Sequence, residues 1–463
     1  MNKIARQLEI SLENECDVAV VGGGPAGFCA AVAAARNGAD TIMVEQYGCG
    51  GGMATAGLVG PFMTSYNKSG DRMIIRGMFE EVIERLIAQG GAIHPRDCRA
   101  GDQIAGYHFR GHDHCAPFDP EILKRVIDEM LTEAKVRVLY HTSFVEPLVE
   151  EGCMKGIVIF SKSGMEAIGA KVVIDCSGDA DVAYRAGVPC ELGDESRGTI
   201  QPSSMFFRIG NVDWKKVDEE AQANMYRNRV IVDGVERGMF HWKIEEARKN
   251  GDFNINRWTV GIYRSVKEDE WCVNISRISD VNGTNTQDIS RAEVIGRQQV
   301  DEIYRFLKKY IPGCENARLL SSASTIGIRE SRHIKGEVTL TAEDILNGKV
   351  PEDAILLASN SIDVHGGEGV AGTKYVTIEN GEWYGVSYRS LVPVKIDQLL
   401  VAGRSLSATS EGAGAVRVMP PCMEMGHVAG VAAALAVREG CTVRSVNVKA
   451  VQAQMMREGS FLG

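Results

Sequence analysis

The sequence predicts an α/β protein with a Rossmann-like parallel sheet that is discontinuous along the chain and an inserted domain of mixed β-sheet and helices. Three observations predict this fold class. A short apolar strand runs into a glycine-rich turn and an alanine-rich helix at 17–36. Two more apolar strands, at 170–174 and 398–401, lead into small residues and glycines. Between these two strands lie β-like segments that are separated by long polar stretches.

The first unit of the chain carries the strongest local signal. Its elements are expected at Asp17–Val21 (strand), Phe28–Arg36 (helix) and Thr41–Val44 (strand), an order typical of a parallel βαβ unit. The turn at 22–27 matches the dinucleotide fingerprint G-x-G-x-x-G. The first glycine allows a tight turn, the second lets the backbone approach a pyrophosphate, and the third packs helix against strand. Glu45 ends the next strand, in the range to accept hydrogen bonds from ribose hydroxyls.

The later elements are expected from capping signals and apolar runs. Asp119 is a helix N-cap with Pro120 at the first helical position, and the helix runs to about Ala134. Three further helices are expected at about 77–89, 290–310 and 422–438, the last being the final long helix. The further strands are expected at 137–140, 156–160, 170–174, 202–209, 258–265, 270–278 and 398–401.

Composition excludes several classes of protein. The 463 residues carry a formal net charge of -10, which argues against nucleic acid or an anionic membrane as a partner. The best apolar run, 428–437, is about half of what a membrane-spanning helix needs, and 1–16 lacks an apolar signal core. None of the 12 cysteines forms a C-x-x-C pair, which favours a reduced cytoplasmic protein without an iron–sulfur cluster.

Several motifs distributed over nearly the whole chain resemble those of the FAD-dependent oxidoreductases of the glutathione-reductase-like superfamily. Besides the fingerprint, these motifs are Gly51-Gly52-Met53-Ala54-Thr55, Phe118-Asp119-Pro120-Glu121, Gly178-Asp179-Ala180-Asp181, Gly327-Ile328-Arg329-Glu330-Ser331-Arg332, Tyr388-Arg389-Ser390-Leu391, Ala402-Gly403-Arg404 and Arg417-Val418-Met419-Pro420. Their combination in this order is more specific than any one of them.

The resemblance implies FAD as the cofactor, bound in an extended form. Its adenine end would lie near Glu45 and Val145, and its isoalloxazine near the final helix. That helix would point its N-terminus at the flavin, where the positive end of the helix dipole, with Arg417, would stabilise the negative charge of the reduced form. The expected cofactor-binding residues are Gly22, Gly24, Pro25, Ala26, Gly27, Glu45, Gln46, Gly52, Thr55, Val145, Ser177, Gly178, Asp179, Gly403, Arg404, Gly414, Arg417, Val418 and Met419.

The FAD-binding domain is expected to consist of three separate parts. They are 1–60 with the βαβ unit, 119–197, and 389–463 with the flavin-end helix. A cap or loop region would occupy 61–118, and a substrate or cap domain would occupy 198–388 and cover the flavin.

The chain contains no second G-x-G-x-x-G in a βαβ setting and no paired redox cysteines. A dedicated NAD(P)H domain is therefore not expected. Electrons would exchange with a substrate or a diffusible cofactor bound directly over the flavin, and the sequence does not identify the electron donor or acceptor.

The candidate catalytic residues are cationic, imidazole and phenol groups in the second half of the chain. Arginine binds carboxylates through two parallel hydrogen bonds, and histidine or tyrosine moves a proton. The candidates are His365, Arg389, Arg329, His333 and Tyr388. In the alternative interpretation, Arg329 and Arg332 only pair with Glu330 and Asp344 to hold a domain interface.

A metal site is not expected, although one segment concentrates metal-ligand residue types. His108, His112, His114 and Cys115 have a spacing that fits no closed structural zinc site, and a substrate-covering loop is the preferred interpretation. A covalent link between Cys49 and the flavin is not expected either.

These observations predict a flavin enzyme that transfers a hydride between flavin N5 and a small polar organic substrate bearing a hydroxyl or carboxylate. Two alternatives stay open: an electron-transfer subunit that works with an iron–sulfur partner, and a non-redox flavoprotein. Nothing in the sequence fixes the oligomeric state, so a homo-oligomer stays open as well.

Overall fold

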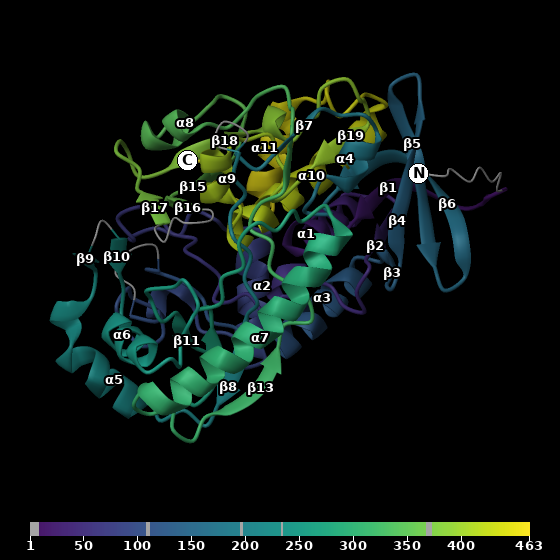
Figure 1. Cartoon of the computed structure of the whole chain (residues 1–463). Coiled ribbons are helices and arrows are strands. Elements are labelled where there is room, and N and C mark those ends of the chain that lie inside the picture. The colour runs from purple at the N-terminus through teal and green to yellow at the C-terminus, as the bar shows by residue number, and fades with distance from the viewer. Residues whose placement is uncertain (1–8, 108–111, 195–197, 233–234, 367–372) are drawn as a thin grey trace.

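The computed structural model describes residues 9–107, 112–194, 198–232, 235–366 and 373–463. A large sheet with its helices forms one region, and a second group of strands and helices packs beside it (Figure 1). Within these residues, no helix is long and apolar enough to cross a membrane.

The large sheet has seven strands in the order β3-β2-β1-β6-β5-β4, with β19 paired to β6 off this path. The strands are β1 (Ser11–Val21), β2 (Thr41–Val44), β3 (Arg137–Leu139), β4 (Ser143–Glu150), β5 (Cys153–Ser161), β6 (Gly164–Asp175) and β19 (Leu399–Val401). β3, β2, β1, β6 and β19 pair in parallel, whereas β4, β5 and the first half of β6 form an antiparallel arm. The carboxyl ends of β1, β6 and β19 therefore meet at one edge, where open α/β sheets bind ligands.

The alternation of β1 explains why the sheet is buried on both faces. Val18 and Val20 join the core that contains α1 and α10, while Ala19 and Val21 join the core on the opposite face. Successive strand side chains point to opposite faces, so an unbroken apolar run suits a strand covered on both sides.

Helices α1 (Pro25–Arg36) and α10 (Met419–Glu439) pack very closely against each other. A Cβ built at Gly426 would overlap the carbonyl oxygen of Ala26, and one at Gly430 would overlap that of Ala30. Both positions therefore require glycine. The close contact fixes the N-terminus of α10 relative to the first turn of α1. The other helices of this region are α2 (Met78–Ala88), α3 (Pro120–Glu133) and α11 (Val448–Arg457).

A second hydrophobic core lies around a four-stranded antiparallel sheet with the order β11-β12-β8-β13. Its elements are β8 (Phe207–Gly210), α5 (Trp214–Ala223), α6 (His241–Lys249), β11 (Ile262–Arg264), β12 (Trp271–Val273), α7 (Thr286–Tyr310) and β13 (Arg318–Ser322). Figure 1 shows these elements together below and to the left of the large sheet.

The remaining elements are short helices and two-stranded hairpins. They are α4 (Asp181–Arg185), β7 (Cys190–Leu192) with β14 (Arg332–Ile334), β9 (Val230–Val232) with β10 (Val235–Arg237), α8 (Ala342–Leu346), β15 (Ala354–Ala358) with β18 (Tyr384–Ser387), β16 (Ile362–His365) with β17 (Thr373–Val376), and α9 (Ser410–Val416). Four 3₁₀ turns complete the set: η1 (Gly52–Ala54), η2 (Pro95–Asp97), η3 (Met225–Arg227) and η4 (Tyr388–Ser390).

The structure confirms a mixed α/β fold with parallel pairing in the central sheet, but the packing divides the chain differently from the expected insertion at 198–388. Apart from Tyr107, the fully buried residues of the second core come from 205–326. Side chains from 340–392 join the first core instead. The reason is that β15, which pairs with β18, packs against α10, the long helix behind the large sheet.

Most expected elements are confirmed, and the differences have local causes. β2 and the N-cap of α3 at Asp119 agree with the prediction. β4 was not predicted, and α11 follows the helix that the sequence indicated as the last. The three long β segments expected in the insertion are short strands of three or four residues.

Candidate active site

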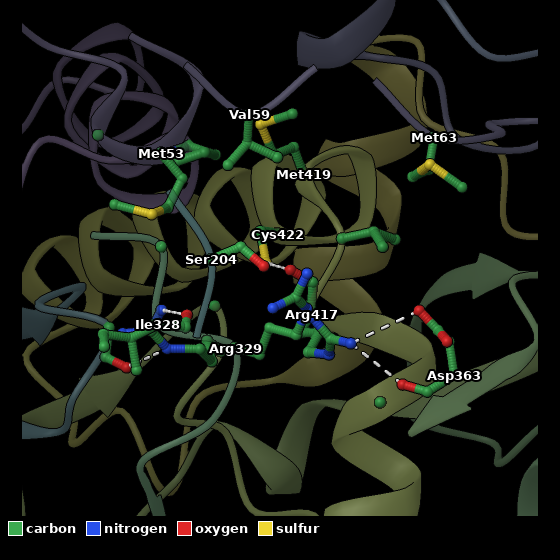
Figure 2. A pocket seen from close by; sticks show the side chains of 18 of the residues that line it. Met53, Val59, Met63, Ser204, Ile328, Arg329, Asp363, Arg417, Met419 and Cys422 are labelled. Carbon is green, nitrogen blue, oxygen red and sulfur yellow. Dashed lines mark hydrogen bonds and ion pairs between the residues drawn. The ribbon is translucent and has the colours of Figure 1, made fainter. Parts of the chain in front are cut away.

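A cavity of about 1110 Å³ lies between the two hydrophobic cores, at the carboxyl ends of β1, β6 and β19. Small-molecule sites are typically ~300–1,000 Å³, so this volume is enough for a large cofactor. In Figure 2, Met53, Val59 and Met63 lie in the upper part of the view, and Arg329, Arg417 and Asp363 lie in the lower part. The cavity thus has an apolar side and a charged side.

The glycine turn forms one end of the cavity, and each glycine has a different surrounding. Gly22 has a φ of +92°, and a Cβ there would lie 2.6 Å from the oxygen of Cys176. A Cβ at Gly27 would overlap the oxygen of Gly22, whereas one at Gly24 would meet no atom within 4 Å. Gly24 is also the N-cap of α1 and gives it no side-chain cap, so backbone N–H groups stay available for a ligand. These surroundings match what a pyrophosphate requires of a dinucleotide turn.

Glu45 holds the shape of this turn. Its side chain is 4% exposed, and its two carboxylate oxygens accept hydrogen bonds from the backbone N–H of Gly23 (2.6 Å) and of Tyr47 (2.8 Å). Burial raises the pKa of Glu45, and these hydrogen bonds oppose the rise. Because a carboxylate oxygen accepts more than one hydrogen bond, Glu45 retains acceptor capacity on the cavity wall.

Arg404 connects the loops that follow β6 and β19 with the loop before β14. Its guanidinium donates to the oxygen of Gly178 (2.7 Å), to a carboxylate oxygen of Asp179 (2.7 Å) and to the oxygen of Ile328. Ser331 also donates to Asp179, at 2.6 Å. Arg404 therefore fixes three wall segments that lie far apart in the sequence.

The N-terminus of α10 opens onto the cavity. Arg417, Val418, Met419 and Cys422 line it, and the N-cap residue Val418 supplies no side-chain cap. The first N–H groups of the helix and the positive end of its dipole are thus available to a bound anion.

The charged side of the cavity contains a His–Asp pair beside arginines. His365 Nε2 lies 3.5 Å from a carboxylate oxygen of Asp363, and a guanidinium nitrogen of Arg417 lies 3.6 Å from the same oxygen. Burial, with the field of Arg329, lowers the pKa of His365 to about 4. Burial alone would raise the pKa of Asp363, but His365 and Arg417 lower it. At neutral pH the pair is therefore a neutral imidazole beside a carboxylate.

Arginine is abundant around this pair. Burial, together with the neighbouring Arg417 and Arg257, lowers the pKa of Arg329 to about 9. Arg277 lies behind them, donates to the oxygen of Gly366 (2.5 Å), and has a pKa lowered to about 10 by burial and by Arg257.

The structure brings most of the expected cofactor residues to the cavity wall. These are Gly22, Gly24, Pro25, Ala26, Glu45, Gln46, Gly52, Ser177, Gly178, Asp179, Gly403, Arg404, Gly414, Arg417, Val418 and Met419. Three others are not among the lining residues. Gly27 faces the inside of the turn, Thr55 donates to the oxygen of Gly50, and Val145 lies one position after the lining residue Phe144.

Of the expected catalytic residues, only His365 and Arg329 line the cavity. Tyr388 is 1% exposed and donates to the oxygen of Val443 at 2.7 Å. The side chain of Arg389 is 51% exposed. His333 is buried, 3.4 Å from Glu330.

The alternative ion pairs for the arginines are not observed. Arg329 donates to the oxygen of Pro202 (2.6 Å), and Arg332 pairs with Asp181 (2.5 Å). Asp344 instead caps α8 through the Thr341 capping box.

Sequence reasoning missed Arg257, Arg277 and Tyr263, two of which line the cavity. Each is a single residue outside any motif, and no signal in the sequence places it near the glycine turn. Only the packing of the second core against the first brings them there.

The histidine-rich segment shows no metal site in the part of the chain that the structure describes. His114 is buried, with Nδ1 3.0 Å from the oxygen of Pro95, and His112 stacks on Tyr263. Cys115 is buried in a small apolar cluster, and His108 lies outside the described residues.

Comparison with known proteins identifies a family for this chain. A family model described as FAD dependent oxidoreductase matches residues 17–455. A curated digeranylgeranylglycerophospholipid reductase from Methanoculleus marisnigri is 28% identical over 180 residues, which cover 38% of this chain and 42% of that protein. The match thus spans less than half of the length of that relative.

Solved structures with a similar chain path include a p-nitrophenol 4-monooxygenase from Pseudomonas putida, with a TM-score of 0.45 and 13% identity, covering 96% of this chain and 87% of that chain. A geranylgeranyl bacteriochlorophyll reductase-like protein from Thermoplasma acidophilum has a TM-score of 0.40 and 16% identity, covering 96% and 82%.

Proposed function

This chain belongs to the FAD dependent oxidoreductase family, and we propose that it transfers a hydride between a small polar organic substrate and N5 of FAD. One observation carries the proposal. A single cavity joins the dinucleotide turn, the N-terminus of α10 and the His365–Asp363 pair. FAD, when bound, supplies a two-electron acceptor or donor. The chain then has to hold the substrate, exclude water and move one proton.

In this proposal the walls of the cavity share the binding of FAD. The glycine turn and the N-terminus of α1 hold the pyrophosphate, and Glu45 accepts from the ribose. The first turn of α10 and Arg417 lie at the flavin end, where they stabilise negative charge on the reduced form. The open space at Gly24 and the unfilled N-cap at Val418 support this assignment.

His365 is the proposed proton-transfer group. When the substrate is an alcohol, loss of a hydride from carbon requires removal of the hydroxyl proton. A neutral imidazole whose Nε2–H points to Asp363 accepts that proton at Nδ1. Asp363 holds the ring and stabilises the imidazolium that forms, because its carboxylate stays ionised. When an activated C=C is reduced, His365 first takes a proton from solvent and then delivers it to carbon as the imidazolium, because the neutral ring has no acidic proton.

The test begins with the purified protein, which we expect to be yellow and to release FAD on denaturation. The protein is then mixed anaerobically with hydroxy acids, sugars, amino acids and enoates, and the visible absorbance of the flavin is followed. Bleaching by an alcohol, or reoxidation of the reduced enzyme by an enoate, supports the proposal. A colourless protein that takes up no added FAD contradicts it.

The same experiment separates the two alternatives. A flavin that no small molecule reduces or reoxidises, together with a stoichiometric iron–sulfur protein in pull-downs, favours an electron-transfer subunit. A flavin that returns to its starting spectrum within one turnover favours a non-redox enzyme.

A further inference from the structure

We propose that Arg257, Arg329 and Arg417 form a subsite that binds a carboxylate group of the substrate, with Arg257 as its principal anchor. This inference rests on the proposed function and names the substrate class that it leaves open. All three side chains line the cavity, and they come from a loop before β11, a loop before β14 and the junction between α9 and α10.

The first argument is the balance of charge. The charged groups whose fields act on Arg329 are Arg417, Arg257, Asp363 and Arg277. Glu330 also acts on Arg417, so within the described residues four guanidinium groups face two carboxylates, Asp363 and Glu330. His365 adds no positive charge at pH 7, because its pKa is lowered to about 4. Like charges in a buried site are costly unless a counter-charge compensates them. A bound anion provides that compensation.

The second argument is the inventory of hydrogen-bond donors. Arg329 donates to the oxygen of Pro202, and Arg417 donates to Gln201 and to the oxygen of Asp363. Within the described residues, the guanidinium of Arg257 has neither a hydrogen bond nor an ion pair, and its Nε is buried without a partner. The Nε of Arg417 is also buried without a partner. The cluster therefore contains buried hydrogen-bond donors that lack acceptors.

The third argument is the shape of the donor. A guanidinium presents parallel N–H groups in one plane, and a carboxylate offers two oxygens in one plane at matching spacing. The His365–Asp363 pair belongs to the same cluster, so a carboxylate held at Arg257 keeps the rest of the substrate near the proposed proton-transfer group.

The opposite part of the cavity indicates that only one end of the substrate is anionic. Met53, Val59 and Met63 line that part and carry no charge (Figure 2). A substrate with a carboxylate at one end and a less polar body suits both sides.

The test is a binding titration of the oxidised, FAD-loaded protein, which needs no turnover. Small monocarboxylates and dicarboxylates, their uncharged amides and inorganic phosphate are added separately, and changes in the flavin absorbance spectrum are followed. We expect carboxylates to bind and amides not to. Arg257→Gln should weaken carboxylate binding about ten- to a hundredfold, as loss of a hydrogen bond between charged groups does.

Two further variants sharpen the result. Arg257→Lys keeps the charge but loses the paired donors, so it should recover only part of the affinity. Arg389→Gln is the matched control, because Arg389 pairs with Asp353 and Glu337 and is not among the residues that line the cavity. It should bind carboxylates like the unmodified protein. FAD content and melting temperature of each variant establish that it is folded.

Several outcomes overturn the subsite: equal binding of amides, binding of phosphate alone, unchanged affinity in Arg257→Gln, or loss of FAD from a folded Arg257→Gln protein. These outcomes differ from failure of the proposed function. If carboxylates bind and nothing reduces or reoxidises the flavin, the hydride-transfer proposal fails and the subsite stands. If a neutral substrate bleaches the flavin and no carboxylate binds, the subsite fails and the hydride-transfer proposal stands.

Discussion

Gly24 and Gly27 lie three positions apart in the same turn, yet only Gly27 is required by the packing of the protein itself. At Gly27 the requirement is internal, because a side chain would overlap the carbonyl oxygen of Gly22. At Gly24 nothing in the protein limits a side chain, so the limit would come only from a bound ligand.

This difference predicts opposite effects of two alanine substitutions. Gly27→Ala should destabilise the protein by about 1–3 kcal/mol or more, as overpacking does. Gly24→Ala should leave the FAD-free protein as stable as before, because its φ of -65° suits alanine. It should nevertheless weaken FAD binding, since the methyl group takes the space of the pyrophosphate. Urea unfolding without FAD measures the stability of both variants, and titration with FAD measures their affinity for the cofactor. Similar stability of the two variants would contradict the different roles assigned to Gly24 and Gly27.

A second prediction at this scale concerns His365. As a proton acceptor it must be neutral, and its pKa is lowered to about 4 by burial and by Arg329 and Arg257, which outweigh Asp363. Activity that depends on this base should therefore be level from pH 5 to 8 and fall as the pH drops toward 4. His365→Asn should lower kcat about 10²- to 10⁴-fold, more than it changes KM.

The measurement is a profile of kcat/KM against pH, with whichever substrate the screen identifies. Tyr388→Phe is the control, because the Tyr388 hydroxyl donates to a backbone oxygen outside the cavity. An acidic limb near the ordinary histidine pKa of about 6.5 would argue against this role for His365.

Which residues reach the cavity could be predicted from the sequence only where a motif fixed the local backbone. The glycine turn and the segments around Gly178 and Arg404 reached the cavity because their strands end there. Tyr388 and Arg389 had the right chemistry, but η4 turns one toward the core and the other toward the surface. Arg257 reaches the cavity through long-range packing, which no local pattern encodes.

Among the elements, α10 connects the packing of the protein with its proposed chemistry. Its middle packs on α1 through Gly426 and Gly430, and its N-terminus opens onto the cavity. The sequence predicted this helix, but from Cys422. The structure starts it at Met419, because Pro420 and Pro421 lie in the first turn, where a backbone N–H has no partner within the helix. In contrast, β4 escaped prediction because it is an edge strand with Pro147 inside it.

The N-terminal half of α10, beyond its first turn, carries a buried charge cluster that predicts a pH-dependent stability. His427 is 1% exposed, forms a hydrogen bond with Glu458 on the turn after α11, and lies 3.7 Å from Glu424. Burial alone would lower the pKa of His427, but these two carboxylates raise it to about 9. Since a raised histidine pKa favours the folded state below the unfolded value of about 6.5, this stabilisation should be full below pH 6.5 and disappear as the pH rises through 9.

His427→Gln should therefore lower the free energy of unfolding at pH 6 by up to about 3 kcal/mol, and by much less at pH 9.5. Urea unfolding at a series of pH values measures this difference. His141→Gln, at an exposed position, is the control and should change little at any pH. A deficit of His427→Gln that stays constant with pH would show that the residue stabilises by packing alone.

At the scale of the whole molecule, the cavity is where the two hydrophobic cores meet. Ile326 and Arg329 come from segments beside the second core, and Gly22 and Gly403 come from the large sheet. The sequence indicated such an arrangement, with three separated parts of one domain and an insertion over the cofactor. It could not indicate that 340–392 packs with the first core, because that depends on contacts with α10 that are distant in sequence.

Because both cores contribute to its walls, a bound FAD should stabilise the molecule as a unit. A ligand that binds only the folded state adds RT ln(1 + [L]/Kd), which is about 2.7 kcal/mol at a hundredfold excess over Kd. We therefore expect the melting temperature of FAD-stripped protein to be low and to rise continuously with added FAD. Trp383 packs against the first core, whereas the other four tryptophans lie in or against the second core. In a Trp383→Phe protein, tryptophan fluorescence therefore reports the second core, and far-ultraviolet circular dichroism reports the whole chain. Both signals should shift upward together if FAD bridges the two cores. In Gly24→Ala the same rise should require more FAD, because the substitution weakens binding and leaves the fold intact. A rise in circular dichroism that the tryptophan signal does not follow would mean that FAD contacts the large sheet alone, and would remove the second core from the cofactor site.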